Sequence, residues 1–188
     1  MAKKKKHPYS EFYLDEVMEN MGYMYQYLRD VHNINIRDSI KMFRKSNIAL
    51  GIELANPHYL CGLFGTELAE ELLGSYDVVE QSHYPDIEYW IGWASAYLQW
   101  YSNVTFDRMY ELVPADRFVC MYGPYHEMWF EHLEEFAEKY IMGHEGEVWV
   151  WTDESLGEYR KKEEVAHLIN DRGYFVDSEL WKNAWKDY

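Results

Sequence analysis

Cysteine is scarce in this chain, which has two among 188 residues. Cys61 and Cys120 lie far apart, each inside an apolar run, so they exclude a disulfide framework and a zinc site built on paired cysteines. We expect two buried free thiols in a reducing compartment. The lysine-rich start, MAKKKKHPYSEFY, has no apolar segment behind it. We therefore expect no signal peptide, no membrane association and a cytoplasmic location.

The motifs of common catalytic chemistry are also missing, since the chain has no GxGxxG, no GxxxxGK(S/T) and no GxSxG. His126 and His132 are six positions apart and would lie on nearly opposite sides of a helix, so they cannot share a metal ion. No Glu-x-x-His pair of the kind used by di-metal bundles occurs. Cys120 and His126 could form a nucleophile and base, but the apolar setting FVCMY is typical of an inert thiol. We expect no catalytic residue, no metal and no cofactor.

Positive charge is the third deficit, with a formal net charge of −15. Between Lys45 and Arg108 there is no lysine or arginine but there are nine carboxylates, and a second block, 127–158, sets ten carboxylates against Lys139. Such a charge distribution repels nucleic acid and favours basic protein partners, although solubility explains it equally well. The lysines at positions 3–6 are the exception, and we expect them to belong to a flexible basic tail over 1–9.

Aromatic residues are abundant, with 18 Tyr, 8 Trp and 8 Phe, enough to build a core from rings and to leave some for a recognition surface. They concentrate in the stretch 86–102. On a helix, its small and polar residues fall on one narrow stripe, and apolar side chains take the remaining circumference. This pattern is typical of a helix buried in a multi-helix core, and the segment is too short and too polar to predict a membrane span.

Periodicity and capping residues predict helices over 10–32, 37–45, 47–57, 66–73, 105–113, 114–122 and 125–144. Thr66 is expected to cap its helix, Gly74 to end it, and Gly123-Pro124 to break the chain. Farther on, 147–151 and 174–176 alternate as strands, with helices expected over 158–173 and 178–188. The sequence thus predicts a mainly α fold: a helical bundle domain over 10–144 around the buried aromatic helix, and a small α+β appendage over 145–188.

Four segments, FYLDEVMENMGYMYQY, NPHYLCGLFGTELAEELL, EYWIGWASAYLQWYS and MYGPYHE, resemble an uncharacterised family of small helical proteins. That family is associated with gut Firmicutes and their mobile elements, often beside small toxin-like or phage-defence genes. The resemblance spans roughly Phe12 to Tyr140 and carries no catalytic residues. It implies a genetic setting, that of a toxin neutraliser or an inhibitor of a defence system.

Acidic charge, abundant rings and missing catalytic motifs together favour a non-enzymatic inhibitor-type protein. We expect it to bind a basic surface of a nucleic-acid-handling partner, such as a toxin or a CRISPR effector, and not nucleic acid itself. Carboxylates would stand where phosphates bind, and rings would fill pockets that stack bases. The residues expected to contact this partner are Glu67, Glu70, Glu71, Glu131, Glu134, Glu135 and Glu138, with Trp149 and Trp151 as aromatic anchors.

Two alternatives stay open. The first is a metal-dependent hydrolase or nuclease that uses clustered carboxylates, and the second is a structural module that forms homodimers through its aromatic faces. The inhibitor hypothesis has one premise: carboxylates that are segregated from cations along the chain also gather in space.

Overall fold

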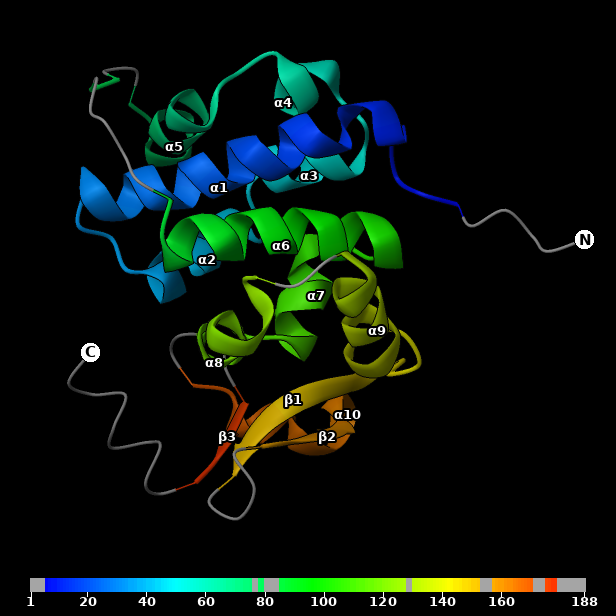
Figure 1. The fold of residues 1–188 in the computed structure, drawn as a ribbon. Coiled ribbons are helices and arrows are strands. Elements are labelled where there is room, and N and C mark those ends of the chain that lie inside the picture. Colours follow the sequence, from blue (N-terminus) through cyan, green and yellow to red (C-terminus); the bar gives the residue numbers. More distant parts are fainter. Residues whose placement is uncertain are drawn as a thin grey trace, which may run out of the picture.

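The chain folds into a bundle of helices that stands on a small sheet, as the computed structural model shows (Figure 1). The structure describes residues 6–75, 78–79, 85–127, 130–152, 157–170 and 175–178. The predicted fold class, mainly helical with a small C-terminal sheet, is confirmed. The helices are a short 3-10 turn η1 (Glu11–Tyr13), α1 (Leu14–Asp30), α2 (Ile36–Phe43), α3 (Asn47–Glu53), α4 (Pro57–Cys61), α5 (Gly65–Leu73), α6 (Ile87–Ser102), α7 (Phe106–Leu112), α8 (Ala115–Tyr125), α9 (Phe130–Tyr140), α10 (Lys162–Val165) and η2 (Ala166–Leu168).

The central helix is α6, as its apolar circumference predicts. It lies between α1 on one side and α7, α8 and α9 on the other (Figure 1). Ile91, Ala94 and Leu98 are completely buried. Gly92 sets the distance to α1, because a Cβ at this position would lie 2.2 Å from the carbonyl oxygen of Met21. Only a glycine lets the two backbones approach so closely.

Side-chain caps determine where several helices begin. Asn35, Ser46 and Thr105 precede α2, α3 and α7, and each accepts a hydrogen bond from a backbone N–H of the first turn. Such caps satisfy donors that have no partner inside the helix. Gly74 ends α5 in the left-handed conformation, with φ of 71°, as the sequence predicts.

Several predicted helix boundaries are wrong. The helix expected over 47–57 ends at Glu53, and Pro57 begins a separate helix, α4. Thr66 is not the cap of α5, because the helix begins at Gly65 with Phe64 in the N-cap position. The expected break at Gly123-Pro124 does not occur, since α8 continues through both residues to Tyr125. Pro124 lies in the last turn, where its missing N–H removes a single hydrogen bond from a helix that is about to end.

The sheet has the strand order β2-β1-β3. β1 (Glu147–Thr152) pairs antiparallel with β2 (Glu158–Lys161) and parallel with β3 (Phe175–Asp177). A helix over 158–173 is therefore a wrong prediction for its first four residues, because pairing with β1 holds them extended. The helix expected over 178–188 and the lysines at positions 3–5 lie outside the described residues, apart from Ser178, which is described and follows β3.

Successive side chains of β1 point to opposite faces of the sheet, and those on one face pack against the helical bundle. Val148 and Val150 belong to a small separate cluster with Val165. Trp149 and Trp151 point to the opposite face and pack against the main core. The sheet thus has a small core of its own on one face and the helical bundle on the other.

Both cysteines are exposed, so the expectation of buried thiols is wrong. Phe118 and Met121 bury one side of α8, and Cys120 follows Phe118 by two residues, which puts it on the far side of the helix. In the described part of the chain, no helix has both the length and the apolar character that crossing a membrane requires.

Candidate cation-binding face

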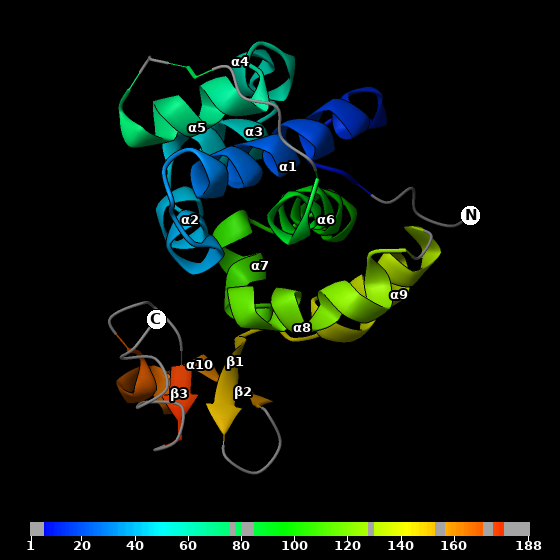
Figure 2. The same ribbon diagram turned by 60° about the vertical axis from the view of Figure 1, so that its left-hand side comes forward.

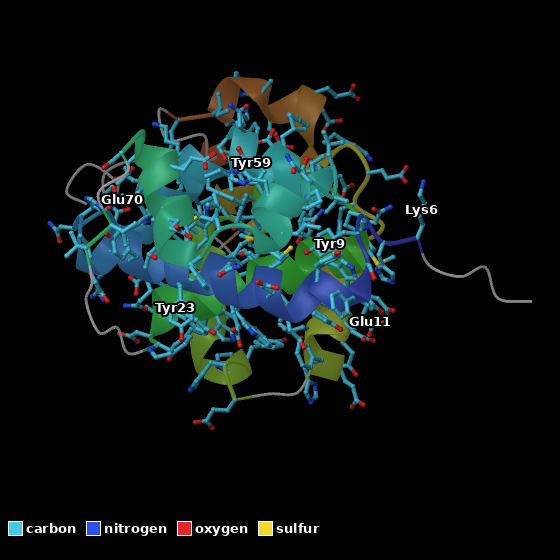
Figure 3. All side chains as sticks on the ribbon, turned by 90° about the horizontal axis from the view of Figure 1, so that it is seen from above. Lys6, Tyr9, Glu11, Tyr23, Tyr59 and Glu70 are labelled. Atoms are coloured by element: carbon cyan, nitrogen blue, oxygen red, sulfur yellow. The ribbon has the colours of Figure 1, made fainter. Side chains whose placement is uncertain are left out.

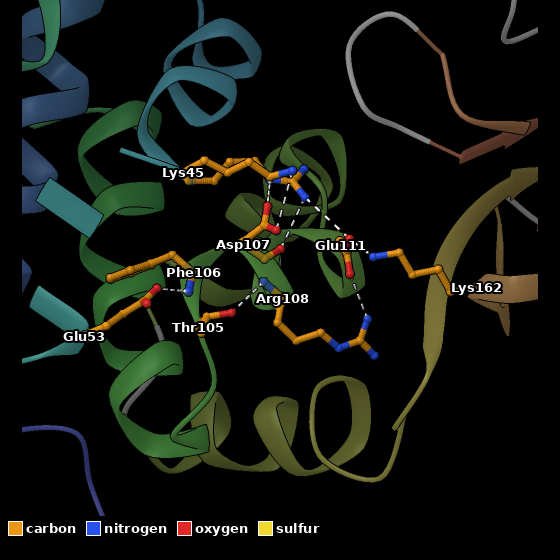
Figure 4. A network of polar contacts seen from close by, with 9 residues as sticks. Lys45, Glu53, Thr105, Phe106, Asp107, Arg108, Glu111 and Lys162 are labelled. Carbon is orange, nitrogen blue, oxygen red and sulfur yellow. Dashed lines mark hydrogen bonds and ion pairs between the residues drawn. The ribbon is translucent and has the colours of Figure 1, made fainter. Parts of the chain in front are cut away.

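Lysine and arginine side chains neutralise one group of carboxylates, which lies on α7 (Figure 4). Asp107 accepts from the Arg44 guanidinium at 2.5 Å. Glu111 pairs with Arg108 at 3.1 Å and with Lys162 at 2.5 Å. The long stretch between Lys45 and Arg108 therefore receives a cation from outside it, because Arg44 before it pairs with Asp107. In this region the premise of segregated charge fails.

A second group of carboxylates has no such partners and lies on the exposed side of η1 and α1. Glu11, Asp15, Glu16 and Glu19 are exposed, and none forms an ion pair with a described lysine or arginine. Like charges three or four residues apart on a helix destabilise it by about 0.2–0.5 kcal/mol a pair. We call these four residues the α1 acidic ridge.

The α1 acidic ridge was not among the residues that the sequence predicted as a binding site. The signal for it is nevertheless present, because Glu11, Asp15, Glu19 and Tyr23 follow one another at intervals of four. The segment 7–28 also contains no lysine or arginine. Figure 3 shows Glu11 and Tyr23 toward one side of the α1 ribbon, and Glu70 toward the other.

On one flank of the ridge is a hollow of about 410 Å³ between α1, α6 and α9, which we call the α9 hollow. Figure 2 shows α6 nearly end-on, with α1 above it and α9 to its lower right. The rings of Tyr97, Tyr101, Trp100 and Phe130 line the hollow together with Glu134. Phe130 is 41% exposed and Tyr101 is half-buried, whereas Tyr97 and Trp100 are buried and His7 stacks on Trp100. Carboxylates combined with ring faces form a site suited to a lysine or arginine side chain.

Two tyrosines of α6 position the carboxylates of α9. The Tyr97 hydroxyl donates to Glu134 at 2.9 Å, and the Tyr101 hydroxyl donates to Glu138 at 3.0 Å. Burial, followed by the hydrogen bond to Glu138, raises the pKa of Tyr101 to about 12. Both hydroxyls therefore stay protonated at neutral pH, and they fix the α9 carboxylates without cancelling their charge.

On the other flank of the ridge is a hollow of about 540 Å³ between α1 and α5, which we call the α5 hollow. Asp15 lines both hollows, so the ridge runs between them. Phe64 and Tyr23 lie in its wall and are 74% and 39% exposed. The ridge and the two hollows thus form one continuous acidic and aromatic surface.

The predicted carboxylates of α5 differ from those of α9, because they are engaged in contacts within the fold. Glu67 caps its own helix, accepting the Phe64 N–H at 2.8 Å, and Glu71 accepts from the Tyr59 hydroxyl at 2.7 Å. Glu70 is 2% exposed, so it is not available to a partner. The α5 carboxylates serve mainly the fold.

Glu70 is held by side chains from other parts of the chain. The Tyr27 hydroxyl donates to it, and the His32 ring nitrogen lies within hydrogen-bond distance of the same oxygen, both at 2.8 Å. Burial alone would raise the pKa of Glu70, but these hydrogen bonds, with a further one from Ser75, outweigh it and hold that pKa below its ordinary value. The carboxylate is ionised and paired inside the protein.

The predicted carboxylates of α9 remain on the surface. Glu131 and Glu135 are exposed, with His132 3.6 Å from Glu135, and Glu134 and Glu138 accept hydrogen bonds from the tyrosines described above. Together with the α1 acidic ridge they form a set that we call the acidic face. It consists of Glu11, Asp15, Glu16, Glu19, Glu131, Glu134, Glu135 and Glu138.

The two predicted tryptophan anchors are used within the fold. Trp151 is 3% exposed. Trp149 stacks under Arg117, whose guanidinium carbon lies 3.7 Å from its ring centre and 4.3 Å from that of Tyr140. Arg117 also donates to the Tyr159 hydroxyl at 2.6 Å. This Arg117 cluster fastens the sheet to α8 and α9, and it lies apart from the acidic face.

Within the described residues, no group of three or more histidine, cysteine, aspartate or glutamate side chains could hold a metal ion. The hydrolase alternative therefore has no ligand set in that part of the chain. Comparisons with protein-family models, with curated proteins and with solved structures find no match. The function has to be argued from the residues themselves.

Proposed function

We propose that the protein binds the basic surface of a nucleic-acid-handling protein, such as a toxin or a CRISPR effector, through the acidic face. One observation carries this proposal. Arg37, Arg44 and Lys162 pair with carboxylates elsewhere, while Glu11, Asp15, Glu16 and Glu19 form no ion pair with a described lysine or arginine. Binding a cationic surface would replace the repulsion between these carboxylates by attraction.

The spacing of the ridge resembles that of a nucleic-acid strand. From Glu11 to Glu19 there are eight steps, which at the rise of a helix is about 12 Å. Four charges over that length lie about 4 Å apart on average, close to the one charge per about 3.4 Å of a DNA strand. A protein surface built to bind phosphates would therefore meet a similar density of negative charge.

The rings of the α9 hollow supply the second element of a nucleic-acid mimic. Tyr101 and Phe130, the more exposed rings of the hollow, lie beside the carboxylates, as bases lie beside phosphates. Arginine side chains that stack on bases in the partner could stack on these rings instead. Occupation of that surface excludes nucleic acid and inhibits the partner.

The test compares two variants of equal charge. The first is D15N/E16Q/E19Q, which neutralises three ridge positions. Each protein is immobilised and exposed to a bacterial lysate freed of nucleic acid, and retained proteins are released with double-stranded DNA. We expect the wild type to retain nucleic-acid-binding proteins that DNA displaces, and the ridge variant to lose them.

The matched control is E145Q/E163Q/E164Q, which removes the same charge from exposed positions outside the acidic face. It should retain the same proteins as the wild type. Equal losses in both variants would mean that net charge alone attracts the partners, as for a solubility surface. Equal retention by all three proteins would exclude the acidic face as a binding site.

A further inference from the structure

The α5 hollow brings the start of α5 together with carboxylates of α1, which we call its rim. Gly65 and Thr66, the first residues of α5, line it. The first N–H groups of a helix have no partner within the helix, so this end of α5 presents donors. A Cβ on Gly65 would lie 2.4 Å from the carbonyl oxygen of Asn20, which shows how directly the start of α5 rests on α1.

Asn20 provides a further donor at the same place. It lines the hollow and is 6% exposed, and its Nδ2 has no hydrogen-bond partner among the described residues. A buried donor without an acceptor is unfavourable, and most such groups in proteins are satisfied. Protein atoms cover this Nδ2, so the amide has to rotate toward the hollow to meet an acceptor there.

The rim decides the charge of the occupant. Asp15, Glu16 and Glu19 stand beside these donors, so a phosphate or carboxylate would be repelled. A neutral acceptor flanked by cations fits both the donors and the rim. The main chain of a basic peptide has this chemistry, because its carbonyl oxygens accept hydrogen bonds while its side chains carry positive charge.

The exposed rings favour arginine over lysine. Phe64 and Tyr23 border the hollow with large exposed areas. A guanidinium stacks on ring faces and is the more frequent partner in cation–π contacts. We infer that the α5 hollow binds an arginine-bearing main-chain segment of the partner, with a backbone carbonyl accepting from Asn20. This inference rests on the proposed function and adds to it the chemistry of one contact.

The test uses two cations of equal charge, an acetylated and amidated tetra-arginine peptide and spermine, which has no carbonyl group. Affinities are measured at low salt by titration calorimetry for the wild type and for N20L. Leucine has nearly the shape of asparagine and removes the unpaired donor, so N20L should melt no lower than the wild type. We expect N20L to bind tetra-arginine about tenfold more weakly, the equivalent of about 1.4 kcal/mol, and spermine with unchanged affinity.

The ridge variant D15N/E16Q/E19Q separates this inference from the proposed function. It should lose affinity for both cations. Suppose the ridge variant loses affinity for both cations while N20L binds both as the wild type does. The Asn20 contact is then wrong, and the acidic face is still supported as a binding site. An equal loss of affinity for both cations in N20L would also overturn the Asn20 contact, because spermine offers no hydrogen-bond acceptor. If the ridge variant binds both cations normally, the proposed function itself fails.

Discussion

Reversing the charge of Glu19 should make the protein more stable and at the same time a weaker binder. Glu19 is exposed on α1, four residues after Asp15 and three after Glu16, so it takes part in two like-charge pairs. Each pair costs about 0.2–0.5 kcal/mol, and each becomes favourable by a similar amount when lysine replaces glutamate. The E19K substitution therefore changes the free energy of unfolding by about 0.8–2 kcal/mol.

Other effects of E19K on stability are small. Glutamate and lysine have similar helix propensities. Glu19 is the sixth residue of α1, beyond the first turn where the helix dipole favours a carboxylate. Salt screens the exposed pairs. We therefore expect a gain of about 1 kcal/mol at low salt, which for a chain of this length raises the melting temperature by about 2–4 °C.

The assay pairs thermal unfolding with tetra-arginine titration, both at low ionic strength. E19K should unfold at a higher temperature and bind tetra-arginine about tenfold more weakly, since a lysine now faces the cation. E164K, an exposed reversal outside the acidic face, is the control and should leave the binding within a factor of two. A melting temperature of E19K at or below that of the wild type would refute the reasoning, because it would mean that the ridge carboxylates do not repel one another.

Three other perturbations test the fold around the acidic face. R117M removes the cation at the centre of the Arg117 cluster, and we expect a loss of about 2–4 kcal/mol in urea unfolding; a loss below 0.5 kcal/mol would show that the cluster does not fasten the sheet. E70Q removes a carboxyl whose pKa is lowered in the folded protein, so the ionised form of Glu70 is the one that stabilises the fold. The loss of unfolding free energy in E70Q should therefore be full above about pH 4.5 and should shrink as the pH falls below it. An equal loss at pH 3 and pH 7 would contradict this. G92A should cost at least about 2 kcal/mol because its Cβ would meet the backbone of Met21; an unchanged melting temperature would contradict the close approach of α1 and α6.

Local patterns predicted the centre of the fold correctly. The apolar circumference of 86–102 identified α6 as the buried helix, and Gly74 was recognised as the end of α5. Both features depend on residues close together in the sequence. A hydrophobic period or a glycine at the end of a helix can be recognised in the sequence without knowing which other segments pack against that helix.

Features that depend on distant partners could not be predicted in this way. β2 forms because β1 offers it a pairing edge, although its residues also suit a helix. Glu70 looks like an exposed acid on an amphipathic helix, yet Tyr27 and His32, from about forty residues earlier, bury and hold it. Which carboxylates remain unpaired was equally hidden, since Arg44 reaches Asp107 across 63 positions.

The predicted carboxylates of α9 lie on the surface, but the prediction from sequence left out those of α1. Residues 127–158 were read as an acidic block because cations are rare there, and the same rule would have found Glu11, Asp15, Glu16 and Glu19 in a segment without lysine or arginine. The helix dipole explains a carboxylate in the first turn of a helix, as for Asp15 and Glu16, but it does not account for Glu19 in the second turn.

The central claim is that the carboxylates of the α1 acidic ridge are free to bind a basic partner. The most direct measurement is the affinity for tetra-arginine across salt concentrations, for the wild type and for D15N/E16Q/E19Q. At 10 mM salt charges act over about 30 Å, and at 1 M over about 3 Å. We predict that the wild type binds much more tightly than the variant at 10 mM, and that the difference disappears at 1 M. Equal affinities at 10 mM would contradict the claim.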